Sequence, residues 1–158
     1  MILLFTVVSA AFCGLAAWGK DDDKPRTARA DESSTIRVRY IVSDVPAAVA
    51  FYTNHLQFHV TAQAGRNFAI VVRDNLQLVL SPPKGPGGAS QPMPDGRRPE
   101  PGGWNRIILP SHNLEKDVEA LKNAGVHFRN NIVSGPGGRE ILLDDPSGNP
   151  IELFEASS

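Results

Sequence analysis

The sequence predicts an α+β protein built from two tandem β-α-β-β-β modules. Short runs in which apolar and polar residues alternate are typical of half-buried strands. Two amphipathic segments have the spacing of helices, and each follows a residue suited to cap a helix N-terminus. The same order of elements then occurs twice, which indicates an internal duplication. With 158 residues the chain is long enough to bury a hydrophobic core.

The first module is expected over residues 35–82. Alternation across residues 36–42 predicts its first strand, and Asp44 with Pro46 just after it predicts the start of a helix. The apolar residues of that helix recur at helical spacing: Val45, Val49, Tyr52 and Leu56. Three further strands are predicted over residues 58–62, 68–72 and 76–80.

The second module is expected over residues 104–156, after a Pro/Gly-rich loop at residues 83–103 that is a flexible connection or a lid. A strand at 104–111 precedes Asn113, the second helix cap, and Gly125 is placed to end that helix. Strands are then predicted over residues 126–130, 139–143 and 150–155. Superposing Asn113 on Asp44 places Arg106 on Arg37, and the last strands of the two modules match with Gln77 opposite Glu152.

Residues 1–34 form an apolar N-terminal segment followed by a polar linker. Residues 1–18 carry no charge and have the length of a signal-peptide core or a short membrane anchor. No Lys or Arg precedes the apolar run, and Phe12 stands before Cys13 where a lipoprotein signal would have a small residue. The protein is exported or membrane-anchored if this segment is a genuine signal, and cytoplasmic otherwise. A membrane contact is expected only through this segment.

Composition excludes some partners and sites. A formal net charge of -1 gives no attraction to nucleic acid, so none is expected as a partner. Cys13 is the single cysteine, which excludes an internal disulfide and a multi-cysteine zinc site. A metal site would therefore be built mainly from histidine and carboxylate ligands.

The most distinctive stretch is Asp144-Asp145-Pro146-Ser147-Gly148-Asn149-Pro150-Ile151-Glu152-Leu153-Phe154. A turn rich in Asp, Pro, Gly and Asn leads into an alternating strand. That strand carries one carboxylate, Glu152, among apolar neighbours. A carboxylate in such a place is ion-paired, a metal ligand or part of a site.

The duplicated unit, the Phe51-Tyr52-x-x-x-Leu56-x-Phe58 segment and the closing motif resemble the vicinal oxygen chelate superfamily. This superfamily contains glyoxalase I, bleomycin-resistance proteins and extradiol dioxygenases, and the resemblance covers about residues 35–156. It implies an incompletely closed eight-stranded barrel with the helices outside and a small-molecule cavity within. It also implies a homodimer. Gln57 departs from the pattern because glycine is usual at its position.

The resemblance also implies four metal-ligand positions, which here hold Arg37, Gln77, Arg106 and Glu152. A guanidinium group has no lone pair to offer a metal and would repel a cation. No cofactor is therefore expected. A divalent metal remains a disfavoured alternative, with Glu152 and Gln77 as its ligands. The histidines lie off these positions and are interpreted as surface or partly buried residues: His55, His59, His112 and His127.

These residues suggest a metal-free site for an anionic or carbonyl-bearing small molecule. Arg37 and Arg106 would clamp the anion, and Glu152 would orient an arginine or act as a general base. The remaining ligand-binding residues expected are Arg39, Gln77, Trp104 and Phe154. Whether the protein is an enzyme is left open; the chemistry expected of one is a lyase or isomerase reaction next to a carbonyl.

Three alternatives stay open. Arg37, Glu152 and Arg106 would form a purely structural ion-pair network if no ligand binds. A drug-sequestering protein of the bleomycin-resistance type would bind its ligand without catalysis. A metal-dependent lyase or isomerase would retain Glu152 as a ligand.

Overall fold

The computed structural model describes residues 35–157. The apolar segment and linker predicted over residues 1–34 lie outside the described residues. Within residues 35–157 no helix is long and apolar enough to cross a membrane.

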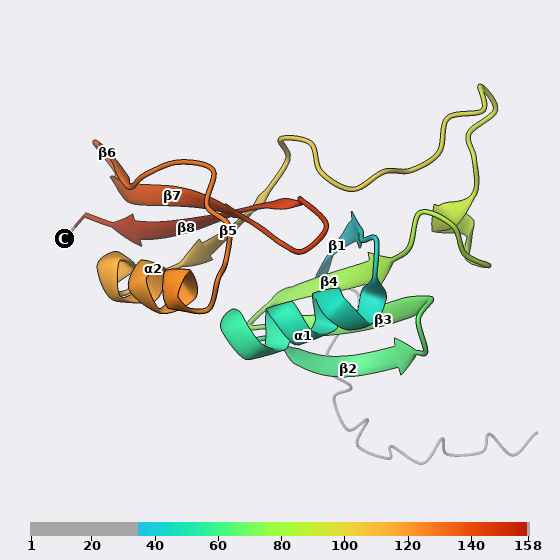
Figure 1. The fold of residues 1–158 in the computed structure, drawn as a ribbon, viewed down its shortest axis with the longest axis horizontal. Coiled ribbons are helices and arrows are strands. Elements are labelled where there is room, and N and C mark those ends of the chain that lie inside the picture. Colours follow the sequence, from blue (N-terminus) through green and yellow to red (C-terminus); the bar gives the residue numbers. More distant parts are fainter. Residues whose placement is uncertain (1–34, 158) are drawn as a thin grey trace, which may run out of the picture. The chain divides into compact units, whose positions relative to one another are not determined.

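The first module has the predicted order of elements. Strand β1 (Ile36–Ile41) is followed by helix α1 (Val45–His55) and by three strands, β2 (His59–Ala64), β3 (Phe68–Arg73) and β4 (Leu76–Ser81). The strands form one mixed sheet in the order β1-β4-β3-β2, in which β1 pairs with β4 in parallel and the other pairs are antiparallel. Helix α1 packs on β2, β3 and β4 (Figure 1).

The second module repeats this plan. It consists of β5 (Ile107–Pro110), α2 (Leu114–Asn123), β6 (Val133–Gly135), β7 (Gly138–Asp144) and β8 (Pro150–Ala156), with sheet order β5-β8-β7-β6. Among the described residues no strand ladder joins the two sheets. The fold is therefore the predicted pair of β-α-β-β-β modules in an α+β chain, but the sheets do not close into a barrel.

The helix ends form where local chemistry predicts them. The Asp44 side chain accepts a hydrogen bond from Ala47 N at 3.0 Å, and Asn113 accepts one from Lys116 N at 3.0 Å. Gly125 adopts φ +78° after α2, and its N–H donates to the Lys122 carbonyl. Both helices are thus fixed at the positions that the repeat assigns.

The second strand of the second module is displaced from its predicted position. Residues 126–130 make one isolated bridge, Phe128 to Leu143, and β6 forms at Val133–Gly135 instead. The Asn130 side chain accepts the hydrogen bond from Leu142 N at 2.8 Å, where a backbone carbonyl would continue the ladder. This side chain interrupts the strand, and the chain pairs again only at the hairpin with β7.

The loop between the modules contains a short 3-10 helix, η2 (Gly88–Ser90), and a turn in which Gly96 N donates to the Met93 carbonyl. Near its end, Gly102 N donates to the Asn149 side chain at 2.7 Å. The loop therefore connects to the turn that precedes β8.

That turn is also bonded to the first module. Asp145 is buried, and its Oδ2 accepts hydrogen bonds from Tyr52 Oη at 3.1 Å and Asn149 Nδ2 at 2.9 Å. Its Oδ1 accepts from the backbone N–H groups of Ser147 and Asn149. Asn149 Nδ2 also donates to the Ile41 carbonyl at 2.9 Å. This network fixes the start of β8 against β1 and α1.

Candidate functional site

The predicted site residues lie on the sheet faces that turn away from the helices. Leu78 and Leu80 of β4 are buried in the core, so alternation places Gln77 on the opposite face. By the same rule Arg37 and Arg39 of β1 point away from Tyr40 and the core. In each module, the sheet face that turns away from the module's own helix is called the helix-free face below.

The two arginines of β1 have partners on this face. Arg37 Nε donates to Gln77 Oε1 at 3.0 Å, and Arg39 Nη1 donates to Ser81 Oγ at 2.6 Å. Both arginines are exposed. Because Gln77 is neutral, the bond leaves the positive charge of Arg37 uncompensated and accessible.

In the second module, Arg106 is paired with a carboxylate of the predicted site. Arg106 Nε donates to Glu152 Oε2 at 2.6 Å, and the side chains are 33% and 5% exposed. Glu152 is thus almost fully buried, whereas the guanidinium that neutralises it reaches solvent. Its other oxygen, Oε1, accepts no hydrogen bond from residues 35–157. Charge-assisted bonds of this length are among the stronger ones in proteins.

The strand register corrects one predicted equivalence. Gln77 lies directly across from Arg37, but Glu152 lies across from Ile108, two residues beyond Arg106. With Val38 matched to Ile107, the first-module residue in the place of Glu152 is Val79. Sequence superposition had matched Gln77 to Glu152, a shift of two residues along the strand that keeps the face unchanged.

The ion pairs stay within each module. Among the described residues, Glu152 pairs with Arg106, and Arg37 pairs with Gln77 rather than with Glu152. The structural alternative of an Arg37–Glu152–Arg106 network therefore reduces to the Arg106–Glu152 pair. Arg37 is not needed to neutralise the buried carboxylate.

Two aromatic residues expected at the site differ in their surroundings. Trp104 is 75% exposed, and the Arg129 guanidinium lies 5.4 Å from its ring centroid in cation–π geometry. Phe154 shares the helix-free face of β8 with Glu152 and lines a small hollow of about 230 Å³ near Gly137.

The sequence interpretation missed an exposed isoleucine, and it placed Tyr52 on the apolar side of the first helix without predicting the hydrogen bonds that the hydroxyl groups of Tyr52 and Tyr40 make. Ile108 is 60% exposed on the helix-free face of β5, where an apolar residue that size is unexpected. Tyr40 Oη donates to the Pro150 carbonyl at 3.1 Å and accepts from Ile107 N at 3.0 Å. Burial raises the pKa of Tyr40 to about 12, and burial beside Asp145 raises the pKa of Tyr52 well above 10. A hydroxyl among otherwise apolar core positions was the available clue.

The four positions implied for a metal do not fit one. Arg37 and Arg106 provide donors only, so two of the four positions offer a metal no lone pair, and a third, Glu152, already has one of its oxygens bonded to Arg106. Across residues 35–157 no three His, Cys, Asp or Glu side chains gather in a metal-binding arrangement.

Comparison with known proteins decides the family. Residues 35–153 match the Glyoxalase/Bleomycin resistance protein/Dioxygenase superfamily. The chain belongs to this superfamily. Proteins of the superfamily bind small molecules.

Solved structures of the superfamily have the same fold. A member from Sphaerobacter thermophilus is 29% identical with a TM-score of 0.60, covering 77% of this chain and 95% of that chain. An antibiotic-binding protein from a Streptomyces species is 26% identical with a TM-score of 0.60, covering 78% and 95%. A lactoylglutathione lyase from Agrobacterium tumefaciens, 16% identical with a TM-score of 0.60 over 79% and 95%, shares the fold. No functionally curated protein matches the chain.

Proposed function

We propose that this superfamily member binds an anionic or carbonyl-bearing small molecule on its helix-free sheet faces without a metal. The observation that carries the proposal is the Arg106–Glu152 pair, which occupies two positions that the family resemblance assigns to metal ligands. The guanidinium takes the place of a metal beside Glu152, and its terminal N–H groups remain to bind a carboxylate or phosphate through paired hydrogen bonds. The net positive charge that attracts an anion comes from Arg37 and Arg39, whose partners are neutral.

The first module contributes a second cationic group. The positive charge of Arg37 is not compensated by its described partner, because Gln77 is neutral. Its Nε is occupied by Gln77, so the terminal Nη groups are the donors left for a ligand. Arg39 adds another exposed guanidinium on the same face of β1. Gln77 is held as an acceptor by Arg37, and its amide N–H groups remain available to a ligand.

Apolar side chains next to these charges suit the body of a small organic molecule. Ile108 and Phe154 lie on the helix-free face of the second module, beside Glu152. Trp104 presents its exposed indole ahead of β5. Sites for small molecules combine such apolar surface with a few placed polar groups. A second copy of the chain would cover these faces, and we propose a homodimer as the functional form.

If the protein is an enzyme, Glu152 is its general base. Oε2 is held by Arg106, which fixes the carboxylate, and Oε1 is left to accept a proton from a carbon next to a carbonyl. Arg106 would then stabilise the enolate oxygen. This is lyase or isomerase chemistry performed by the protein's own residues.

The test titrates the full chain with benzoate, phenyl phosphate and uncharged benzamide by calorimetry. The proposal expects the two anions to bind and benzamide to bind at least tenfold more weakly. Arg37→Met should weaken anion binding at least tenfold, whereas Arg98→Met, the matched change of an exposed loop arginine, should not. If the Arg37→Met and wild-type proteins bind both anions with equal affinity, the proposed arginine clamp is refuted.

A second candidate is drug sequestration without catalysis. It is favoured by the 26% identity to an antibiotic-binding protein over 95% of that chain. The exposed Trp104 ring, with Arg129 over one of its faces, offers its other face as a stacking surface for a planar drug. Quenching of tryptophan fluorescence by planar antibiotics tests it. Saturable quenching that Trp104→Leu abolishes and Arg37→Met leaves intact would favour sequestration over the anion site.

A further inference from the structure

A small hollow of about 230 Å³ lies at the β6–β7 hairpin, on the helix-free face of the second module. This hairpin hollow is lined by the hairpin and by one residue of β8: Val133, Ser134, Gly135, Pro136, Gly137, Gly138, Glu140 and Phe154. Sites for whole drug-sized ligands are larger, about 300–1,000 Å³. The hairpin hollow therefore has the size of a subsite for one group of a ligand.

Three side chains stand in one row across the hairpin hollow. Glu140 of β7 lies directly across from Val133 of β6 on one side and from Phe154 of β8 on the other. Directly opposed residues of an antiparallel sheet project from the same face, with Cβ atoms about 5 Å apart. The Glu140 carboxylate is thus held between an aliphatic and an aromatic side chain.

The Glu140 carboxylate has no cationic partner among residues 35–157. The residue is half-buried, and within that part of the chain its side chain forms no ion pair or hydrogen bond. The neighbouring Arg139 points to the other face of the sheet, where it is paired with Glu115 and Glu155. Glu140 is therefore an uncompensated negative charge beside apolar surface, which favours an incoming cation.

The Phe154 ring extends toward the hairpin turn. A Cβ atom added at Gly137 would lie 3.9 Å from Phe154 Cζ, so the glycine leaves the end of the ring without a covering side chain. An ammonium group is attracted both by a carboxylate and by the face of an aromatic ring. The hairpin hollow brings these two kinds of group together.

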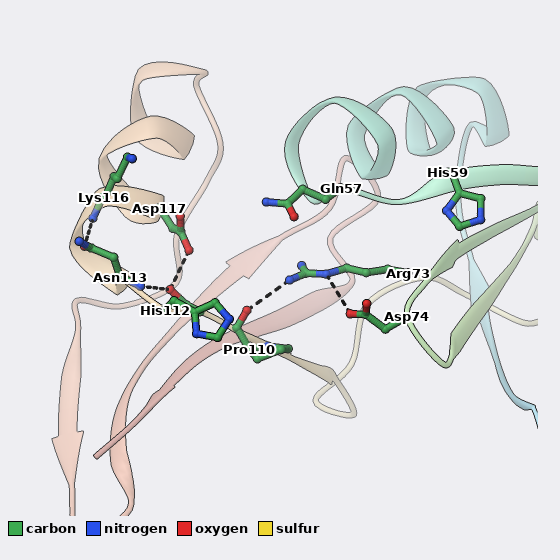
Figure 2. Close-up of a pocket in the computed structure, with 10 residues that line it drawn as sticks. Gln57, His59, Arg73, Asp74, Pro110, His112, Asn113, Lys116 and Asp117 are labelled. Atoms are coloured by element: carbon green, nitrogen blue, oxygen red, sulfur yellow. Dashed lines mark hydrogen bonds and ion pairs between the residues drawn. The ribbon is translucent and has the colours of Figure 1, made fainter. Parts of the chain in front are cut away.

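The hollow between α1, β3 and α2 differs in its charges (Figure 2). It has a volume of about 610 Å³, and its lining includes two fixed cations, Arg73 and Lys116, and two carboxylates, Asp74 and Asp117. These charges balance, so that hollow does not favour a ligand of either sign. Among the described residues that line the hairpin hollow, Glu140 alone is charged.

We propose that the hairpin hollow is a subsite for a protonated amine of the ligand. The ammonium group would lie between the Glu140 carboxylate and the Phe154 ring, with its carbon stem against Val133. This inference rests on the function proposed above, because the subsite lies on the same helix-free face. It adds a positive group to the anionic or carbonyl-bearing ligand.

The amine subsite is close to the Arg106–Glu152 pair. Glu152 shares the helix-free face of β8 with Phe154, two residues away, and is therefore the diagonal neighbour of Glu140. Diagonal neighbours of this kind are about 7–8 Å apart. One small molecule can thus span the amine subsite and the surroundings of Glu152.

The test titrates the full ¹⁵N-labelled chain with benzylamine and with uncharged benzyl alcohol, at pH 7 and constant ionic strength. Benzylamine should give saturable amide chemical-shift changes at residues 133–140 and 152–155, and benzyl alcohol should bind at least fivefold more weakly. Glu140→Gln should weaken benzylamine binding at least fivefold, because it removes the charge and keeps the shape. Glu119→Gln, the same change at an exposed glutamate of α2, should leave it unchanged.

Shifts that stay linear in benzylamine concentration, or equal affinity of the Glu140→Gln and Glu119→Gln proteins for benzylamine, would overturn the subsite. A parallel titration with benzoate separates this inference from the function that it extends. Benzoate binding without benzylamine binding would refute the amine subsite and leave the arginine clamp in place. Benzylamine binding without benzoate binding would refute the clamp and leave the amine subsite.

Discussion

The Arg106–Glu152 pair predicts that the effect of Glu152→Gln on the free energy of unfolding changes sign when Arg106 is removed. Arg106→Met removes the partner of a carboxylate that is 5% exposed, so a buried charge is left without compensation. Breaking a fully buried pair in this way costs about 3–5 kcal/mol. Because Arg106 is one-third exposed and water can reach its place, we expect about 2–3 kcal/mol.

Glu152→Gln is expected to cost less, about 1–2 kcal/mol. The amide oxygen still accepts from Arg106 Nε, and only the charge assistance is lost. In the Arg106→Met background the same change should reverse its sign. It removes the unpaired charge and should restore about 1–2 kcal/mol of stability.

Urea denaturation of the four proteins at pH 7.5, followed by circular dichroism, measures this cycle. Wild type is expected to be the most stable of the four and Arg106→Met the least stable, with Glu152→Gln and the double variant between them. If Glu152→Gln lowers the stability of the Arg106→Met protein further, Glu152 is not a desolvated charge neutralised by Arg106, and the basis of the metal-replacement argument fails.

Other predictions follow from individual contacts. Tyr52→Phe should cost about 1–3 kcal/mol in urea denaturation because buried Asp145 loses a hydrogen bond. Folding raises the pKa of Tyr52, so its contribution to the free energy of unfolding is fully present below the pKa of tyrosine in the unfolded chain, about 10, and is lost as the pH rises above that value. Tyr52→Phe should therefore make stability fall less steeply at alkaline pH. Gly138→Ala should lower the free energy of unfolding by more than about 3 kcal/mol, since its Cβ would overlap the Glu155 carbonyl; a loss below about 1 kcal/mol would contradict this. Gln57→Gly should raise the melting temperature, by a gain of up to about 1 kcal/mol from relieved left-handed strain.

Local chemistry made much of the fold predictable. Asp44 and Asn113 are side chains that bond the backbone a few residues on, and such short-range bonds can be recognised in a sequence. The β6 displacement was not predictable, because the side chain of Asn130 bonds the backbone of Leu142 on another strand. The alternation of apolar and polar residues cannot show that the Asn130 side chain will accept the hydrogen bond from a backbone N–H of another strand.

The sequence could predict which face of each sheet carries the candidate site residues, but not which of these residues pair with one another. Alternation places Arg37, Arg39 and Glu152 away from the core, as the sequence indicated. Which strand residue stands across from which depends on sheet register, and the two modules differ in register by two positions at Glu152. The hollow lined by both Arg73 and Lys116 was beyond sequence reasoning, because these residues belong to different modules and line it only once the chain has folded.

The Asp145 turn of the second module is hydrogen-bonded to Tyr52 and Ile41 of the first module, and the first module has no equivalent turn. In the first module the corresponding connection, between β3 and β4, is the short Asp74-Asn75 turn, which holds no such network. The duplicated halves have therefore ceased to be interchangeable. A permuted chain that exchanged their order could keep every strand pair within each sheet, yet it must still let the turn before β8 reach Tyr52 and Ile41. A half-length chain carrying residues 104–157 alone would expose Asp145 and lose the hold on the strand that carries Glu152. The second half has become dependent on the first for the geometry of its own carboxylate.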